Sequence, residues 1–260
     1  MNTDANIVVI DKALAEFEEI DLESLNQRSA LLERVERKYI VDMRDLPALL
    51  LALRETHSLL AINGNRLHRY TSTYFDTPDL LCFRAHNQQR SNRFKLRVRS
   101  YLDSHQAFFE LKEKTRVSAT RKLRQPAQDP ESTLPEQLVE RVAQLSQRHH
   151  PLVFRRNLIV SYSRITLASK VENLRLTIDT DLSFCLHDNP QAGVSASKAI
   201  IEVKSHKPFS LTDRLLREHG LRPQKQLSKY CIAAIACGLQ SGNNRFRAGY
   251  KKIMEDDRRA

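Results

Sequence analysis

The chain has 260 residues, of which 41% are hydrophobic and 28% are charged, a composition that excludes wholesale disorder and suits one large domain or two small ones. Its 42 lysines and arginines exceed its 31 acidic residues, and the formal charge of +11 predicts an anionic partner. Only 6 glycines are present, and neither GxxxxGKS/T nor GxGxxG occurs, which argues against a glycine-rich phosphate loop.

In chain order, the hydrophobic pattern predicts a helix over 11–30 that breaks near Ile20, a strand at 34–41 and a buried helix at 45–60. Further strands are expected at 67–76, 93–101, 107–115 and 118–124, followed by a helix at 131–150. The remaining expected elements are strands at 158–167, 174–183 and 197–205, and helices at 208–220 and 228–239. Residues 77–92 and 125–135 are predicted loops, and 241–260 is a predicted loose, charged tail.

Targeting signals are not evident in the sequence. The longest apolar run, Cys231–Leu239, is too short to cross a membrane, and no basic stretch precedes an apolar run at the amino terminus. The four cysteines lie in apolar surroundings without a CxxC motif, as is typical of buried thiols in a reducing compartment. We therefore expect a cytoplasmic protein without a membrane span.

The alternation of side chains within the strands is the most informative feature, because residues i and i+2 share one face of a strand. The expected strand at 93–101 carries a run of cations on one face and Phe94, Leu96 and Val98 on the other. The residues that share the charged faces of the expected strands are Arg34, Glu36 and Lys38; Arg93, Lys95, Arg97 and Arg99; Glu110, Lys112 and Lys114; Lys122 and Arg124; Tyr162 and Arg164; Arg175, Thr177 and Asp179; and Glu202 and Lys204.

Two arrangements of this charged face are open. In the first, an antiparallel sheet exposes a solvated outer face. A solvated face normally mixes both signs, because like charges opposite one another are unfavourable, whereas cations predominate here. In the second, the sheet curls into a barrel of about eight strands whose charged face lines a tunnel. A polyanion would then compensate the dehydrated cations, and the sparse acids would pair with cations or hold a divalent metal.

Short motifs along most of the chain carry a resemblance to a known family. They are RVERKYIV, RYTSTYFDT, KLRVRSY, FFELKEK, TRKLR, VSYSRITL, RLTIDTDL, IIEVK and LSKYC. With these motifs in this order, and with this alternation of charged and apolar residues inside them, residues 30–235 resemble the VTC-type polyphosphate polymerase domain. That domain is a branch of the CYTH or triphosphate tunnel metalloenzyme superfamily. The resemblance implies an α+β fold, an eight-stranded antiparallel β-barrel with flanking helices. It divides the chain into a helical segment (1–30), a tunnel domain (31–240) and a charged tail (241–260).

The resemblance also implies a metal-dependent polyphosphate polymerase, which transfers the γ-phosphate of ATP to a growing polyphosphate chain with Mn²⁺ or Mg²⁺. Its implied catalytic residues are Arg97, Arg99, Lys112, Arg164 and Lys229. The expected phosphate-binding residues are Arg34, Lys38, Lys95, Lys122, Arg124, Tyr162, Arg175, Lys204 and Ser228. Glu202 is the main expected metal ligand, and Glu36, Glu110 and Asp179 are secondary candidates.

Two departures from the family pattern bear on the reaction. Hydrolytic members carry ExExK on the first strand, whereas the chain has Arg34 in place of the first acid, which favours the polymerase branch. Some relatives place a lysine where the chain has Gln226, so one phosphate contact is open. A triphosphate tunnel hydrolase acting on inorganic or nucleoside triphosphate, and a non-catalytic polyphosphate or nucleotide sensor, remain alternatives.

Nucleic acid is not an expected partner, because the aromatic residues do not interleave with the basic stripes as they would in a stacking platform. ATP and inorganic polyphosphate are the expected partners. The sequence does not indicate an oligomeric state.

Overall fold

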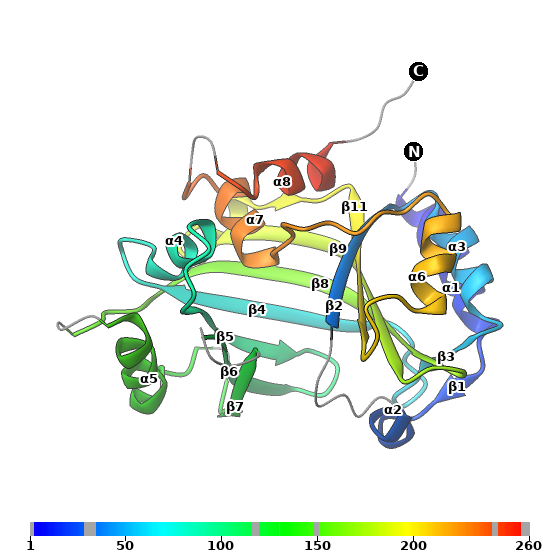
Figure 1. Cartoon of the computed structure of the whole chain (residues 1–260), viewed down its shortest axis with the longest axis horizontal. Helices are drawn as coiled ribbons and strands as arrows, with labels where there is room; N and C mark the ends of the chain where they lie inside the picture. Colours follow the sequence, from blue (N-terminus) through cyan, green and yellow to red (C-terminus); the bar gives the residue numbers. More distant parts are fainter. Residues whose placement is uncertain are drawn as a thin grey trace.

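The computed structural model describes residues 3–28, 35–115, 120–129, 131–147, 151–240 and 244–255, with side chains described from Val8 onward. A curved sheet lies at its centre, with helices packed around it (Figure 1). The helices are α1 Thr3–Ala15, α2 Leu22–Arg28, α3 Leu46–Leu53, α4 Leu81–Asn87, α5 Glu136–Ser146, α6 Leu211–Glu218, α7 Lys229–Ala236 and α8 Arg247–Met254, with a 3₁₀ turn at Pro190–Ala192. The strands are β1 Glu19–Ile20, β2 Val35–Asp42, β3 His57–Leu60, β4 His68–Asp76, β5 Arg93–Tyr101, β6 Gln106–Lys114, β7 Arg121–Ala127, β8 Arg155–Ser169, β9 Leu174–Leu186, β10 Val194–Ser195 and β11 Lys198–Ser205.

Eight of the strands form one antiparallel path in the order β2-β11-β9-β8-β4-β5-β6-β7. They correspond to the eight strands predicted from the sequence, so the α+β architecture with an antiparallel sheet and flanking helices is confirmed. Within the described ranges, β2 and β7 are not paired with each other, so backbone hydrogen bonds do not close the sheet into a barrel. Side chains bridge the gap instead: Lys112 Nζ on β6 lies 3.0 Å from Glu36 Oε2 on β2.

Three short strands were not predicted. β1 pairs in parallel with β3, β3 pairs with β8, and β10 pairs with β9. β3 occupies the last four residues of the helix predicted at 45–60, and His57–Leu60 are all buried. The helix prediction is wrong there, because pairing with distant strands outweighs a local apolar periodicity.

The apolar side of β2, β9 and β11 packs against α1, α3 and α6 (Figure 1). Buried residues of this core include Tyr39, Val41, Leu49, Ile178, Ile201, Val203 and Leu216. Because side chains alternate along a strand, this packing turns the charged side chains of the same strands to the opposite side of the sheet. We call that side the concave face.

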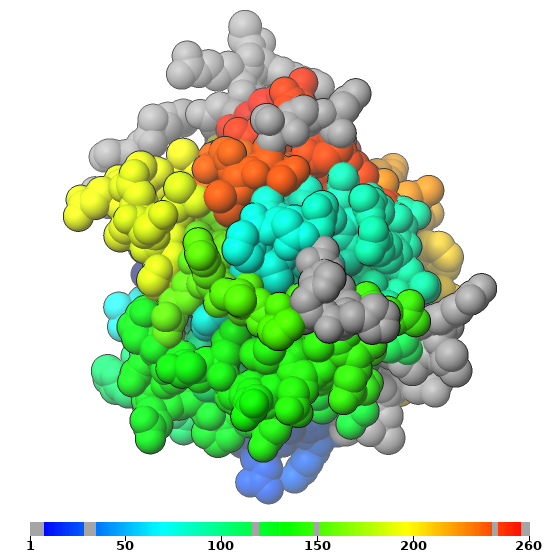
Figure 2. Space-filling view, turned by 90° about the vertical axis from the view of Figure 1, so that its left-hand side faces the viewer, coloured from blue at the N-terminus to red at the C-terminus, as the bar shows by residue number. Residues whose placement is uncertain are grey.

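A second core joins β4, β5, β6 and β8 to α4, α5, α7 and α8. Seen from the end of the molecule in Figure 2, α7 and α8 in orange and red lie directly above α4 in cyan to teal. Buried residues of this second core include Phe83, Phe94, Leu96, Val98, Leu138, Val142, Tyr230 and Ile253. Within the described ranges, no helix combines the length and the apolar character required to cross a membrane.

Two helices lie where the sequence predicted a loop and a loose tail. α4 begins beside Asp76, whose carboxylate accepts the backbone N–H groups of Cys82 at 2.8 Å and Phe83 at 3.0 Å. The Asp76 carboxylate thereby satisfies backbone N–H groups that have no partner within the first turn of the helix. The residues after Asp76 are typical of a turn, so the sequence did not predict this helix. α8 is held by buried Ile253 and by Gly249, where an added Cβ would lie 2.8 Å from the Gln226 carbonyl oxygen. The prediction of a loose tail is therefore wrong over 247–254.

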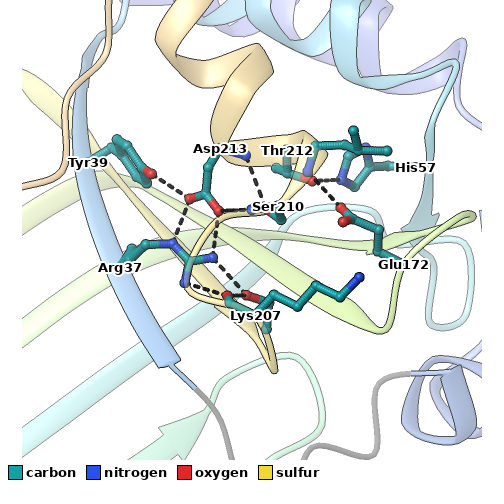
Figure 3. A network of polar contacts seen from close by, with 10 residues as sticks. Arg37, Tyr39, His57, Glu172, Lys207, Ser210, Thr212 and Asp213 are labelled. Carbon is teal, nitrogen blue, oxygen red and sulfur yellow. Dashed lines mark hydrogen bonds and ion pairs between the residues drawn. The ribbon is translucent and has the colours of Figure 1, made fainter.

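A polar network holds α6 to the outer side of the sheet (Figure 3). Arg37 donates through Nε and Nη2 to the two carboxylate oxygens of Asp213 at 2.7 and 2.6 Å, and the Tyr39 hydroxyl donates to the same carboxylate at 2.5 Å. Asp213 also forms a capping box with Ser210. Burial favours the neutral acid, but the donors from Arg37, Ser210 and Tyr39 hold the pKa of Asp213 below its ordinary value. We call these four residues the α6 clip.

Candidate functional site

The strand register aligns the predicted site residues of β5, β6 and β7 in rows across the concave face. Lys95, Lys112 and Lys122 are opposite one another on the three strands. Arg97 and Glu110 belong to the next row, which Arg124 completes on β7. Like charges directly opposite one another destabilise a sheet, so the lysine row has a cost that an anion would offset.

Glu110 is the centre of the arginine row, with a side chain only 2% exposed. Its carboxylate accepts Arg97 Nε at 2.9 Å and Nη2 at 2.5 Å, and Lys122 Nζ lies 2.5 Å away. Arg99 Nε and Arg124 Nε lie at 3.7 and 4.0 Å. Burial alone would raise the pKa of Glu110, but the surrounding cations hold it far below its ordinary value. One buried carboxylate thus organises four cations.

Asp179 has the same role on β9, where its side chain is fully buried. Arg164 donates to its two oxygens at 2.5 and 2.8 Å, and the ammonium group of Lys229 contacts the second oxygen. Against the effect of burial, these two cations lower the pKa of Asp179 to about 2. Lys229 is the first residue of α7, and Ser228 caps that helix by accepting the backbone N–H of Cys231 at 3.3 Å. The SKY motif therefore brings a cation from a helix start onto the sheet.

Glu36 and Glu202 form a third acidic position on β2 and β11. Lys38 Nζ lies 3.6 Å from Glu36 and 3.8 Å from Glu202, and the two carboxylates adjoin one another. Lys204 Nζ lies 2.8 Å from Glu202, and Lys112 contacts Glu36 across the gap of the sheet. Burial opposes ionisation, but Lys204 and Lys38 hold the pKa of Glu202 well below its ordinary value.

A divalent metal suits this third position better than the other two. Mg²⁺ and Mn²⁺ are bound through one or two carboxylates together with phosphate oxygens, and Glu36 and Glu202 supply two adjoining carboxylates. The carboxylates of Glu110 and Asp179 are engaged by arginine as well as lysine, whereas those of Glu36 and Glu202 contact lysines only. In the described part of the chain, no three histidine, cysteine or acidic side chains converge as a metal centre.

Lys95 differs from its neighbours because it makes no ion pair with any residue that the structure describes. Burial lowers the pKa of its amine to about 8, and the charges of Lys38, Lys112 and Arg97 act in the same direction. Burial likewise lowers the pKa of Lys122 to about 8, although Glu110 partly opposes this shift. The concave face therefore holds cations that its own carboxylates do not neutralise.

The cations differ in how far solvent reaches them. The side chains of Arg99, Arg164 and Lys229 are each 12% exposed. Those of Lys122 and Arg124 on the outer strand β7 are 41% exposed. The interior of the curled sheet is therefore largely shielded, and its β7 edge is open to water.

The remaining predicted residues have separate positions. Arg175 Nη2 donates to Asn26 Oδ1 of α2 at 2.9 Å, so its guanidinium is engaged by that helix. The Tyr162 ring stacks on Tyr70 with centroids 5.4 Å apart, and its buried hydroxyl has no hydrogen-bond partner among the described residues. Arg34 lies outside the described residues. Gln226 faces Arg245, the residue that precedes Phe246 in the α8 region.

Sequence reasoning missed the aromatic residues of this face. Tyr70, Tyr74, Tyr101 and Phe108 lie among the arginines, and the Tyr74 hydroxyl accepts Arg97 Nη1 at 3.0 Å. The expectation that aromatic residues do not interleave with the basic stripes is therefore wrong on β4, β5 and β6. The sequence could have indicated these rings, because residues two apart in a strand share a face. Tyr101 lies two residues from Arg99, and Phe108 lies two residues from Glu110.

Two cavities lie away from the buried carboxylates. One of about 350 Å³ lies between β7 and α5 and is lined by Arg121, Leu123, Gln125 and Arg141 among others. Another of about 220 Å³ lies between α4 and the end of α5. Arg124 also lines the first cavity, but Glu110, Asp179 and Glu202 line neither, so the candidate site is defined by the ion-paired side chains.

Comparisons with known proteins agree with this architecture. A family model described as the VTC domain matches residues 33–237. No curated protein sequence matches the chain. A "putative adenylate cyclase" from Bacillus halodurans is 16% identical, with a TM-score of 0.50, and the match covers 75% of this chain and 94% of that chain. At this identity, the likeness shows the fold alone.

Two further solved structures are similar at lower TM-scores. HpAC1 from Hippeastrum, described as having a dominant triphosphatase activity, is 15% identical over 79% of this chain and 97% of that chain, with a TM-score of 0.45. The PH1012 protein from Pyrococcus horikoshii OT3 is also 15% identical, over 76% of this chain and 99% of that chain, with a TM-score of 0.45.

Proposed function

Since this chain belongs to the VTC domain family, we propose that it is a metal-dependent polyphosphate polymerase, which transfers the γ-phosphoryl group of ATP to a growing polyphosphate chain on the concave face. The proposed partners are ATP and inorganic polyphosphate, and the proposed location is the cytoplasm. Nucleic acid is left out of the proposal because Arg99, Arg164 and Lys229 are each only 12% exposed and do not form an open basic surface. The observation that carries the proposal is the excess of shielded cations over carboxylates, with Lys95 unpaired among the described residues. A chain of phosphates supplies the missing negative charge along the whole face.

The cations have distinct tasks in this proposal. Arg97 and Arg99 present planar guanidinium groups that bind phosphate oxygens bidentately, whereas Lys112, Lys122 and Lys229 act as point charges. Glu110 holds Arg97, Arg99 and Lys122 in position before the substrate arrives, and Asp179 holds Lys229. Little reorganisation therefore accompanies the reaction. The acceptor is already an anionic oxygen, and therefore alignment and charge neutralisation suffice without a protein base.

Glu36 and Glu202 are the residues that would hold Mn²⁺ or Mg²⁺, because their carboxylates adjoin and offer hard oxygen donors. The metal would neutralise charge on the transferring phosphates. In this proposal, Glu110 and Asp179, which were also expected as metal ligands, act as counter-ions of the arginines and lysines instead.

The test is incubation with ATP and Mn²⁺ or Mg²⁺, followed by gel electrophoresis of the product. We expect long polymer from the wild type and at least about tenfold less from Arg97→Ala, because a charge-assisted contact contributes about 1.5–3 kcal/mol. Arg54→Ala is the matched control, since Arg54 forms only exposed ion pairs, with Glu16 and Glu55, beside α3 on the outer side of the sheet. It should retain synthesis.

The outcomes separate the alternatives. Release of orthophosphate without polymer would contradict the polymerase proposal and indicate a triphosphatase. Tight binding of polyphosphate without turnover would also contradict it and indicate a sensor. Equal synthesis in Arg97→Ala and wild type would remove the proposed site.

A further inference from the structure

Aromatic rings gather at the β5–β6 hairpin end of the concave face. The Tyr101 ring packs edge-on against Tyr70 and Phe108, with centroids 5.0 and 5.8 Å apart. The Arg124 guanidinium lies 3.6 Å from the centre of the Phe108 ring and 5.3 Å from that of Tyr101. All three rings are partly exposed, so they form a surface that reaches solvent and not a closed core. We call Tyr70, Tyr101, Phe108 and Arg124 the aromatic cluster.

The strand register places this cluster next to the phosphate-binding candidates. On the concave face, β5 carries Tyr101, Arg99, Arg97 and Lys95 in that order, and Phe108 lies opposite Arg99. Strand residues rise about 3.4 Å each, so Lys95 lies roughly 20 Å from Tyr101 along the strand. The aromatic cluster therefore adjoins the hairpin end of the row of cations, where Arg99 lies over Tyr70 and Arg124 lies over Phe108.

Inorganic polyphosphate has no group that gains from an aromatic surface. A nucleobase does, because it stacks on aromatic rings and on the planar guanidinium of arginine. The cations beside the cluster would then receive the phosphates of the same molecule. The rings therefore suit the base of a nucleotide, and the neighbouring cations suit its phosphates. A phosphate chain alone would require only the cations.

We propose that Tyr101, Phe108 and Arg124 form the binding subsite for the base of a nucleoside triphosphate donor, whose phosphates extend along β5 toward Lys95. The inference rests on the proposed function and adds to it a base subsite and a direction for the bound donor. The γ-phosphate lies at the lysine end of the face, and the base lies at the hairpin end.

The test compares the dissociation constants of ATP and tripolyphosphate, measured by calorimetry at one salt concentration. In Phe108→Leu, ATP binding should weaken about fivefold or more, since stacking on an aromatic side chain is worth about 5- to 150-fold per base. Tripolyphosphate binding should stay within about twofold of the wild type. Phe108→Tyr, which keeps the ring, should restore the wild-type ratio of the two constants.

Two further variants keep the test decisive. Phe209→Ala removes an exposed aromatic ring beside Arg217, outside the concave face, and should leave both constants unchanged. Tyr101→Leu replaces Phe108→Leu if the latter does not fold, with the same expected loss for ATP alone.

Failure of the inference and failure of the proposed function give different results. If neither ligand binds the wild type, the proposed function is overturned and the base subsite with it. If both ligands bind the wild type, but the ratio of their dissociation constants is the same in Phe108→Leu as in the wild type, only the base subsite is overturned. An equal loss for both ligands would likewise assign Phe108 a purely structural role.

Discussion

Buried arginine–carboxylate pairs lie on both sides of the sheet, but the ratio of cations to carboxylates differs between the two sides. In the α6 clip on the outer side, one guanidinium, that of Arg37, meets one carboxylate, that of Asp213, and Tyr39 and Ser210 complete its hydrogen bonds. On the concave face, the single carboxylate of Glu110 meets four cations. The chemistry of the pairs is the same, and only the ratio of charges differs. A balanced ratio is typical of a structural contact, whereas an excess of one sign indicates a binding site.

The largest expected effect comes from removing the carboxylate on either side. Asp213→Ala should lower the free energy of unfolding by about 3–5 kcal/mol, because it strands buried Arg37 and removes a helix cap. Glu110→Gln should lower it by a similar amount in buffer, because the four cations lose their counter-ion. Urea unfolding with and without tripolyphosphate distinguishes the two sites.

Tripolyphosphate at one fixed concentration, a hundred times the wild-type dissociation constant, should stabilise Asp213→Ala and the wild type by equal increments of about 2.7 kcal/mol. The increment should be larger for Glu110→Gln, since phosphate oxygens replace the missing carboxylate. Equal increments in all three proteins would contradict a binding role for the charge excess.

An intermediate effect is expected at Lys95. Its pKa is lowered to about 8, so folding penalises its charged form. That penalty is complete below pH 8, fades as pH rises toward the ordinary lysine pKa of about 10.4, and is absent above it. Lys95→Met should therefore raise the free energy of unfolding by roughly 3 kcal/mol at pH 7, with a gain that shrinks above pH 8. Chemical denaturation across this pH range measures it.

Binding should respond in the opposite sense. Lys95→Met should weaken tripolyphosphate binding at pH 7, and wild-type binding should weaken as pH rises through 8 and Lys95 and Lys122 lose their protons. Lys207→Met, which changes an exposed lysine beside the α6 clip, should change neither property. A pH-independent affinity would contradict the assignment of Lys95.

The smallest expected effect separates two buried tyrosines. Tyr39→Phe removes a hydroxyl that donates to Asp213, and should lower the free energy of unfolding by about 1 kcal/mol. Tyr162→Phe removes a hydroxyl without a partner among the described residues, and should leave stability within about 0.5 kcal/mol. Tripolyphosphate affinity should fall a few-fold only in Tyr162→Phe. Thermal unfolding and calorimetry of the two variants test this, and a loss of stability at Tyr162 would refute it.

The eight strands of the path were predictable, because alternation is a local property that a single segment displays. The same parity correctly assigned Arg97, Glu110, Lys112 and Arg164 to one face. α4 and α8 were missed, since their stability depends on Asp76 and on the packing of Gly249 against a distant loop. β3 was missed for the same reason, because its partners lie on β1 and β8.

The amino-acid order alone decided which side chains share a face, because successive residues of any strand point to opposite sides. It did not decide which of the two faces lies inside, which cations surround which carboxylate, or that Lys95 is left without an acidic partner among the described residues. Those features depend on the curl of the sheet and on the register between strands such as β2 and β6, which are distant in sequence. Tertiary structure decided them because electrostatic pairing acts through space, whereas alternation acts along the chain.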